Sequence, residues 1–270
     1  MQNRDGSAAH ALAWMREGWD RLHREPARWL GMTLMFFAIG LILKNIPFLG
    51  NFVLVLISPI MLAGALMAAR SSPAMTAPQD TKQWFQTFTL DGLRELFQVF
   101  RREDHAFAIV IVCIVTLGLV VLVNIPELLI TGGSVVSGLS GISLVGPIRP
   151  GMVVGIVVVV ALYLLLSMAL IYVVPLTLFG NRQPVPAVAE SFRACIANRS
   201  ALAMFVAPFV AINFAIMLAF SLEIWVGYVL LLSLGVVALP IFVIGLNASY
   251  RGLFEKPVSA ASPAITSIAP

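Results

Sequence analysis

Few side chains in this sequence have the types and spacing needed for acid–base, nucleophilic or metal chemistry. The three histidines are His10, His23 and His105. None of them has a second ligand at the i, i+4 spacing that would place two metal-binding side chains on one face of a helix. The REDH stretch, Arg102–His105, lies directly before a long apolar run, where a solvated helix start explains its charges better than a catalytic site. We therefore expect no catalytic residue, no metal, no cofactor and no enzymatic activity.

Two other features resemble chemical motifs and are better explained otherwise. Gly133–Gly138, GSVVSG, has the glycine spacing of a phosphate-binding loop, but Leu139 and Ser140 follow it in place of Gly-Lys. We interpret this stretch as a flexible connection rich in glycine and serine. Cys113 and Cys195 form no CxxC pair and no disulfide framework, so both are expected to be free thiols.

The composition is that of a membrane protein. Of the 270 residues, 60% are hydrophobic and only 11% are charged, whereas a typical soluble domain has roughly 25% charged residues. A helix needs ~20 residues to cross the apolar layer of a bilayer. Apolar runs of that length predict six spans, at about 28–46, 49–69, 106–129, 152–178, 201–221 and 225–248. The net charge of +4 is interpreted through membrane topology, and no nucleic-acid partner is expected.

Lysine and arginine are distributed unevenly between the connections. All 17 of them except Lys44 and Arg149 fall in the N-terminal segment, in the second and fourth connections, or after the last span. Connections rich in lysine and arginine remain in the cytoplasm. The sequence therefore predicts that both termini are cytoplasmic.

A charged amphipathic segment precedes the first span. One helix face is formed by Leu12, Met15, Trp19 and Leu22, and the charged residues lie elsewhere. Such a helix is suited to the headgroup layer, and Pro26 after it is suited to the first turn of the next helix. The same apolar spacing recurs at Val185, Val188, Phe192 and Cys195. A weaker copy aligns Asp91, Gly92, Leu93 and Leu96 with Glu17, Gly18, Trp19 and Leu22.

A second motif recurs near the cytoplasmic end of each even-numbered span. PIMLAG (Pro59–Gly64), PLTLFG (Pro175–Gly180) and PIFVIG (Pro240–Gly245) share a proline followed five residues later by glycine. Proline removes a backbone donor and crowds the preceding turn, so each span is expected to bend or loosen there. We expect the three segments to enclose a centre that faces the cytoplasm, where a ligand or partner binds. The candidate residues of this centre are Pro59, Gly64, Pro175, Gly180, Pro240 and Gly245.

The two recurring features together predict an internal triplication. The expected fold is an all-α integral membrane domain, residues 1–256, with six transmembrane helices in three hairpin repeats. A cytoplasmic interfacial amphipathic helix precedes each hairpin. The repeats cover about 8–70, 81–182 and 185–251, and residues 257–270 are expected to form a disordered tail.

Uncharged polar residues and alanines add two expectations within the spans. Thr116, Ser167, Asn213 and Asn247 lie at membrane depth, where an unpaired polar group is costly. For Asn213 a hydrogen bond between helices is favoured over substrate binding, and both alternatives remain open. An alanine at every fourth position of the fifth span predicts close packing against a neighbouring helix or a second copy. These alanines are Ala203, Ala207, Ala211, Ala215 and Ala219.

The combination of these motifs resembles that of a known group of proteins. The EGW opening, the hairpins that end in the proline–glycine motif, and ESFRACIANRSALAMF from Glu190 resemble an uncharacterised family of proteobacterial inner-membrane proteins. More distantly, the chain is similar to the membrane domain attached to some glycerophosphodiester phosphodiesterases. The resemblance implies a bacterial inner membrane, and it supplies no catalytic residues.

The function expected from these features is non-enzymatic. Abundant interfacial helices and few charges within the spans favour a protein that organises membrane lipids or membrane partners. The alternative is a small-molecule or lipid transporter with a path between the repeats. The expected partners are membrane lipids and, in addition, a membrane protein or a second copy of the chain.

Overall fold

The computed structural model describes residues 4–46, 49–71, 92–101, 103–131, 135–138, 141–144 and 152–255. The first half contains α1 (Arg4–Arg24), α2 (Pro26–Lys44), α3 (Leu49–Arg70), α5 (Gly92–Leu96), the 3-10 helix η2 (Gln98–Arg101) and α6 (Glu103–Thr131). The second half contains β1 (Val135–Gly138), β2 (Gly141–Leu144), α7 (Met152–Leu170), α8 (Val173–Phe179), α9 (Pro184–Ala197), α10 (Arg199–Leu222), α11 (Ile224–Leu230), the π-helical turn η3 (Leu231–Gly235) and α12 (Val236–Phe254).

Six helical stretches in these described ranges are long and apolar enough to cross a membrane. They are Pro26–Leu43, Leu49–Arg70, Ala106–Pro126, Val157–Phe179, Arg199–Leu222 and Ile224–Phe254. The six predicted spans are thereby confirmed as apolar helices, and the chain has the architecture of a multi-pass membrane protein. Their number and position follow from hydropathy alone, because a continuous apolar helix satisfies every backbone group internally.

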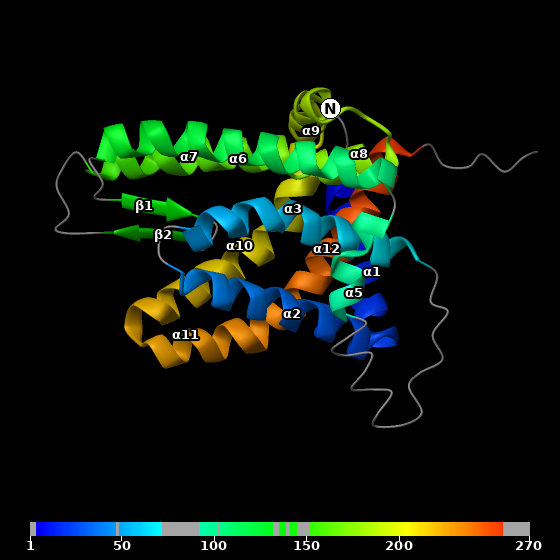
Figure 1. Cartoon of the computed structure of the whole chain (residues 1–270), viewed down its shortest axis with the longest axis horizontal. Helices are drawn as coiled ribbons and strands as arrows, with labels where there is room; N and C mark the ends of the chain where they lie inside the picture. Colours follow the sequence, from blue (N-terminus) through cyan, green and yellow to red (C-terminus); the bar gives the residue numbers. More distant parts are fainter. Residues whose placement is uncertain are drawn as a thin grey trace, which may run out of the picture.

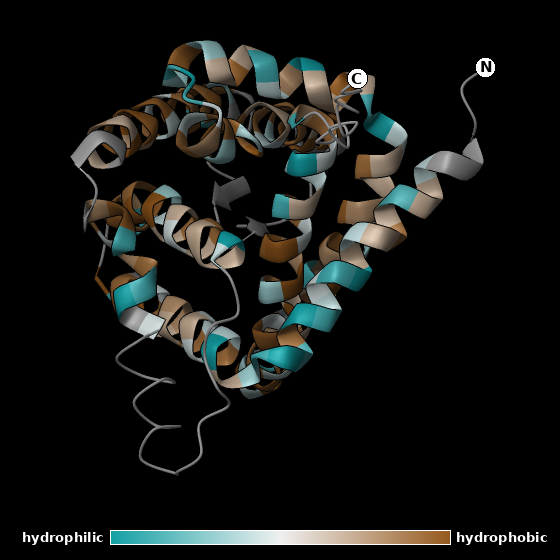
Figure 2. Cartoon of the chain, turned by 90° about the vertical axis from the view of Figure 1, so that its right-hand side faces the viewer, coloured by the Kyte–Doolittle hydropathy of each residue, from teal (hydrophilic) through white to brown (hydrophobic). Residues whose placement is uncertain are grey.

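The long helices run in similar directions, and the charged N-terminal helix crosses them. In Figure 1, α2, α3, α6, α7 and α11 lie roughly along the horizontal axis and α10 runs obliquely, whereas α1 stands across one end and α9 is seen end-on. Figure 2 views that end and shows hydrophilic residues along the outer side of α1. Pro26 begins α2 directly after α1 ends, as expected for a residue whose fixed φ suits the first helical turn.

The buried face of α1 differs from the predicted one. Leu12 and Trp19 are 57% and 49% exposed, whereas Ala11, Trp14 and Gly18 are buried with Leu22. The reason is a close helix crossing, because a Cβ added at Gly18 would lie 2.7 Å from the carbonyl oxygen of Ile241 in α12. Ala11 and Gly18 permit this close crossing, and the larger side chains Trp14 and Leu22 complete the contact surface of the helix.

In α9, too, the side that packs into the protein differs from the predicted apolar face. Val185 of the predicted face is 67% exposed, while the buried residues of the helix are Pro184, Ala187, Ser191 and Cys195. Only Cys195 belongs to both sets. The predicted apolar face was assigned to the membrane surface, and its residues Val185, Val188 and Phe192 flank the side of α9 that packs into the protein.

The second amphipathic segment is shorter than expected within the described residues. It consists of the five-residue helix α5 and the 3-10 helix η2, and not of one continuous helix. Leu96 and Val99 are buried in this segment. Its predicted upstream part, including Asp91, lies outside the described residues, as does the expected tail from residue 257.

The expected Gly/Ser-rich connection contains regular structure. Val135–Gly138 pairs antiparallel with Gly141–Leu144, with Val135 opposite Leu144 and Gly138 opposite Gly141. This hairpin lies at the opposite end of the long helices from α1 (Figure 1). The described part of the chain is thus helical apart from this one short hairpin.

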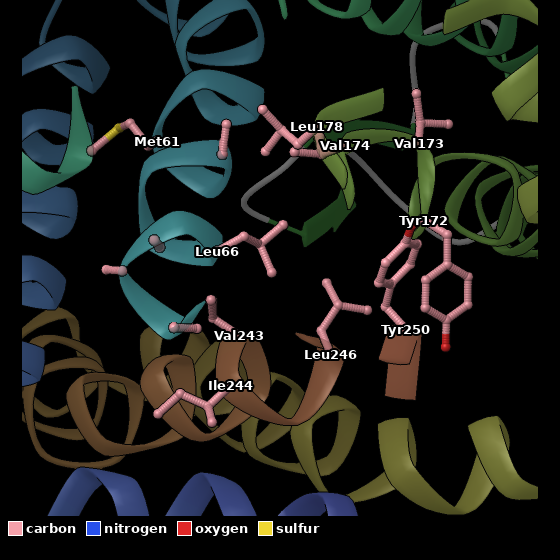
Figure 3. Packing of buried hydrophobic residues seen from close by; sticks show 14 of the residues in the cluster. Met61, Leu66, Tyr172, Val173, Val174, Leu178, Val243, Ile244, Leu246 and Tyr250 are labelled. Atoms are coloured by element: carbon pink, nitrogen blue, oxygen red, sulfur yellow. The ribbon is translucent and has the colours of Figure 1, made fainter. Parts of the chain in front are cut away.

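The largest apolar core lies where α3, α8 and α12 meet. Figure 3 shows Met61 and Leu66 of α3, Val174 and Leu178 of α8, and Leu246 of α12 near one another. All of these side chains are buried. The core therefore includes side chains from all three helices that carry the proline–glycine motif, together with buried side chains of α1, α2, α5, α6, α9 and α10.

The alanine ladder of α10 does not pack inside the chain. Ala203, Ala207, Ala211 and Ala215 are exposed, and Ala219 alone is buried. The buried residues of α10 include large side chains, such as Phe205, which stacks against Phe242 at a centroid distance of 5.8 Å. The expectation of close packing against a neighbouring helix of the same chain was therefore wrong for most of the ladder.

Candidate functional site

The three motif prolines are all buried, but only one lies next to an interrupted helix. Pro59 and Pro240 stand inside α3 and α12, whose helical structure continues through them. Before Pro175, α7 ends at Leu170 and α8 begins at Val173. The loosening expected at the three prolines is thus present as a helix interruption in the fourth span and as the π-helical turn that ends five residues before Pro240 in the sixth.

Ser191 of α9 bridges the interruption before Pro175. Its hydroxyl donates to the carbonyl oxygen of Met168 at 2.9 Å and accepts the backbone N–H of Tyr172 at 3.1 Å. These two backbone groups would bond to each other in a continuous α-helix. The serine is therefore inserted into the helical hydrogen-bond ladder, which is a recognised cause of a kink.

The motif glycines allow other elements to approach closely. A Cβ at Gly64 would lie 2.5 Å from the carbonyl oxygen of Glu95 and closer still to that of Leu96, and Gln98 donates to Gly64 O at 2.8 Å. A Cβ at Gly245 would lie 2.6 Å from the Phe205 ring in α10 and 3.1 Å from a backbone oxygen of α1. Gly64 thus allows α5 to pack closely against α3, and Gly245 allows α10 and α1 to pack closely against α12.

The third motif glycine ends its helix. Gly180 is the C-terminal cap residue of α8. A Cβ at this position would lie 2.7 Å from Leu176 O and 3.1 Å from the hydroxyl of Tyr250 in α12. This glycine therefore lies between its own helix end and α12.

Arg70 joins the ends of α3, α8 and α12. Its guanidinium lies 3.5 Å from the ring centroid of Phe179, and Nε donates to Oδ1 of Asn247 at 3.1 Å. Nη2 forms an ion pair with Glu255, and the Tyr250 ring lies 5.4 Å from the guanidinium carbon. A planar guanidinium can stack on an aromatic ring and donate in its own plane at the same time. Arg70 therefore links the three even-numbered spans by one side chain.

An apolar cavity of about 170 Å³ lies between α2, α3 and α12, with α5 contributing one wall. Its lining includes Trp29, Met32 and Phe36 of α2, Met61 and Ala65 of α3, Leu96 of α5, and Pro240 and Val243 of α12. The two hydroxyls in the lining, Thr33 and Ser58, each donate to a carbonyl oxygen of their own helix. The cavity surface is therefore almost wholly hydrocarbon, and it includes one motif proline.

Trp29 contributes to the cavity lining, and its indole nitrogen is buried without a partner among the described residues. Trp29 is 1% exposed, and its Nε1 has no hydrogen-bond acceptor among the described residues. An unsatisfied buried donor costs about 1–3 kcal/mol.

Arg28, which directly precedes the cavity residue Trp29 in the sequence, is buried and connects the helices that form the cavity walls. Arg28, 8% exposed, donates from Nε to both carboxylate oxygens of Glu95 at 2.8 and 2.7 Å, and from Nη1 to Glu25 at 2.7 Å. Its Nη2 donates to the hydroxyl of Ser71 at 2.7 Å. Every guanidinium nitrogen of Arg28 thus has a partner, as a buried charge requires. The cluster joins α2, the end of α3 and α5 beside Trp29 and Leu96.

The predicted polar residues at membrane depth have different environments. Asn247 is buried and bonded to Arg70. Asn213 is exposed on α10 and forms no hydrogen bond to another helix within the described ranges, so both interpretations of this residue remain predictions. Ser167 bonds to Tyr163 of its own helix, and Thr116 is partly buried in α6.

The pKa shifts of ionisable groups outside the spans do not favour catalysis. Burial raises the pKa of the Cys195 thiol to about 11, and its Sγ donates to Met168 O at 3.3 Å. Burial also lowers the pKa of Arg21, whose Nη2 donates to Ser71 O at 2.5 Å. A thiol with a raised pKa is a poor nucleophile at neutral pH. Within the described ranges, His, Cys, Asp and Glu side chains form no cluster of three that could hold a metal ion.

Arg28, Arg70 and Ser191 are the functional candidates that the sequence argument missed. The two arginines contributed to the topology prediction only, and the serine was overlooked on a helix considered for its apolar face. A signal was available for Arg70, because Arg251 also follows its motif glycine by six residues. Arg251 forms an ion pair with Glu17 of α1.

Comparison of the chain with protein-family models, with curated proteins and with solved structures finds no match.

Proposed function

We propose that this chain is a non-enzymatic, multi-pass protein of a bacterial inner membrane that binds a membrane lipid through an acyl chain. The binding site is the cavity between α2, α3 and α12, and the bound lipid is held at a fixed place in the protein. The observation that carries the proposal is this apolar cavity of about 170 Å³ within membrane-spanning helices.

The size and chemistry of the cavity favour hydrocarbon as its occupant. A dry apolar cavity of ~150 Å³ can hold a molecule as large as benzene. A cavity of this kind offers water no hydrogen-bond partners, whereas an acyl chain from the surrounding bilayer fits its lining.

The proposal includes the topology expected from the sequence. The termini are cytoplasmic, and α1, α5 with η2, and α9 belong to three repeats, each followed by a hairpin of spans. Two packing relations support this arrangement. The α5 helix of the next repeat packs closely against the motif glycine Gly64, and α1 of the first repeat packs closely against Gly245.

Lipid analysis of the purified protein tests the cavity. The Ala65→Phe variant places a ring in the cavity from α3, and Ala161→Phe makes the same change on the exposed surface of α7. The wild-type protein, purified in mild detergent, is expected to retain about one phospholipid per chain. The Ala65→Phe protein should lose most of it, whereas Ala161→Phe should retain it. Equal lipid content in all three folded proteins would contradict the proposal.

A transporter is the second candidate, and two irregular spans favour it. The fourth span is interrupted between Leu170 and Val173, and the sixth contains the π-helical turn Leu231–Gly235. Broken helices of this kind often line substrate sites in secondary transporters. Substrate-dependent flux in liposomes that is abolished by Ala65→Phe would favour this candidate over static lipid binding.

A further inference from the structure

A second apolar hollow lies on the other side of the molecule, beside α9. Its volume is about 370 Å³, and its walls come from α6, α7 and α9. Val115 and Leu119 of α6 and Ala169 of α7 form the wall from the spans. Val188 and Phe192 contribute from α9, which is the amphipathic helix of the third repeat. We refer to this hollow as the α9 groove.

The side of α9 that borders the groove is apolar and separate from the side that packs into the protein. Val185 lines the groove and is 67% exposed, and Ile196, 11 residues further along the helix, is 45% exposed. At ~100° per residue these two positions lie on nearly the same side of the helix. Ser191 and Cys195 are buried on a different side, where both contact Met168 of α7. A segment of α9 therefore presents unburied hydrocarbon next to a hollow between two spans.

Positive charge is concentrated beside this groove. Arg182, Arg193 and Arg199 lie immediately before, within and immediately after α9, and all three are exposed. Glu190 is the only acidic residue from 182 to 199, and it lies 3.5 Å from Arg182. Arg193 and Arg199 form no ion pair within the described ranges. The local excess of positive charge is complementary to a phosphate, and arginine is well suited to bind one.

We propose that the α9 groove binds an anionic phospholipid, with an acyl chain between α6, α7 and α9 and the phosphodiester at Arg193. This site is distinct from the cavity between α2, α3 and α12, and it does not depend on that cavity having an occupant. The groove provides the apolar contact, and the arginines provide selectivity for the headgroup. An interfacial basic residue contributes ~1 kcal/mol to the binding of an anionic lipid, which corresponds to a factor of roughly five in affinity.

Native mass spectrometry of the full chain with added phosphatidylglycerol or phosphatidylcholine tests the inference. The wild-type protein is expected to bind phosphatidylglycerol more tightly than phosphatidylcholine. Arg193→Gln should reduce the affinity for phosphatidylglycerol roughly fivefold and leave that for phosphatidylcholine unchanged. The control, Arg16→Gln, removes an exposed arginine of α1 and should leave the preference intact.

The apolar part of the site is tested by filling the groove. Ala189→Trp should weaken binding of both lipids, and Val185→Trp provides a second change at an exposed position that the fold tolerates. Ala161→Trp on the exposed surface of α7 is the matched control. Equal affinity of the wild type for both lipids, or unchanged binding in both groove variants, would overturn the proposal.

Failure of the groove proposal can be distinguished from failure of the proposal that a lipid occupies the cavity between α2, α3 and α12. Ala65→Phe is expected to remove the lipid that co-purifies and to leave the preference for phosphatidylglycerol unchanged. If Ala65→Phe removes that preference while the groove variants retain it, the groove proposal is overturned and the cavity proposal stands. Association of two copies through the groove, detected as a dimer that Val185→Trp disrupts, would also overturn it.

Discussion

Arg70 shows how a single residue can unite segments that are far apart in the chain. Its partners lie in α8, in α12 and just after α12, and they include an aromatic ring, an amide oxygen and a carboxylate. The guanidinium remains partly accessible, so its charge is not fully desolvated. Its contribution is therefore expected to come from geometry as much as from charge, because a lysine could not stack and donate in one plane.

At Gly64 the close approach of α5 leads to a sharp prediction. Gly64→Ala should destabilise the protein by about 1–3 kcal/mol, since the added Cβ would overlap backbone oxygens at the end of α5 that cannot rotate away. The hydrogen bond from Gln98 to Gly64 O would be displaced at the same time. Thermal unfolding in detergent measures the loss.

Gly118 provides the matched control for this substitution. It lies in the α6 helix, and a Cβ there would have no neighbour within 4 Å. Gly118→Ala should be neutral or slightly stabilising, because alanine favours a helix more than glycine does. Equal effects of the two substitutions would contradict the close contact between α3 and α5.

Among the elements, α9 has a contact that its sequence pattern did not indicate. Its apolar face was expected to lie on the membrane surface, and another side of the helix packs into the break of the fourth span through Ser191. A buried serine supplies one donor and accepts one bond there, so it satisfies two backbone groups that proline-induced distortion has separated. The helix therefore has a structural role in the fourth span in addition to its position beside the groove.

Ser191→Ala tests this role. Loss of the hydroxyl leaves the N–H of Tyr172 without its partner and removes one of two donors from the carbonyl of Met168. An unsatisfied buried backbone group costs about 1–3 kcal/mol, and the thermal stability should fall accordingly. Ser221→Ala is the control, since Ser221 is exposed and donates only to Met217 O of its own helix. No difference between the two variants would show that water or relaxation satisfies the break.

The spans and the start of α2 could be predicted from the sequence, whereas the contact faces could not. Hydropathy determines where a helix can enter a bilayer, and Pro26 determines where α2 begins, because both are local properties. The packed face of α1 depends on Ile241, which is distant in the chain and approaches Gly18 through its backbone. Hydrophobicity ranks Trp19 above Gly18, so a periodicity argument identifies an apolar face suited to the membrane surface and not the side of α1 that packs against α12.

The candidate site was predictable only in outline. The motif segments were expected to converge, and side chains from α3, α8 and α12 do share one core (Figure 3). The cavity lies to one side of that core, and it uses Trp29 and Met32 from the first span, which carry no motif. Cavity position depends on how side chains of several helices fit together, and this is not encoded in any local pattern.

At the scale of the whole molecule, the positions of Arg28 and Arg70 are related to the expected topology. Arg28 and Arg70 belong to the positive charges that assign one end of the spans to the cytoplasm. Both have structural partners, so part of this charge bias stabilises the fold as well as directing insertion. Arg193 and Arg199 have no ion-pair partner within the described ranges, and they remain available to anionic lipids of the leaflet that the topology prediction places on the cytoplasmic side.

The orientation of the whole chain is tested by reporter fusions. Alkaline phosphatase, which is active only outside the cytoplasm, should be active when fused after Ser140 and inactive when fused to the C-terminus. The physical reason is the concentration of lysine and arginine in the connections assigned to the cytoplasm, since Lys44 and Arg149 are the only ones on the opposite side. A fluorescent protein that folds only in the cytoplasm should give the reverse pattern at the same two positions. If phosphatase activity appears only at the C-terminus, the chain is inserted the other way round, and Arg193 would meet lipids of the opposite leaflet.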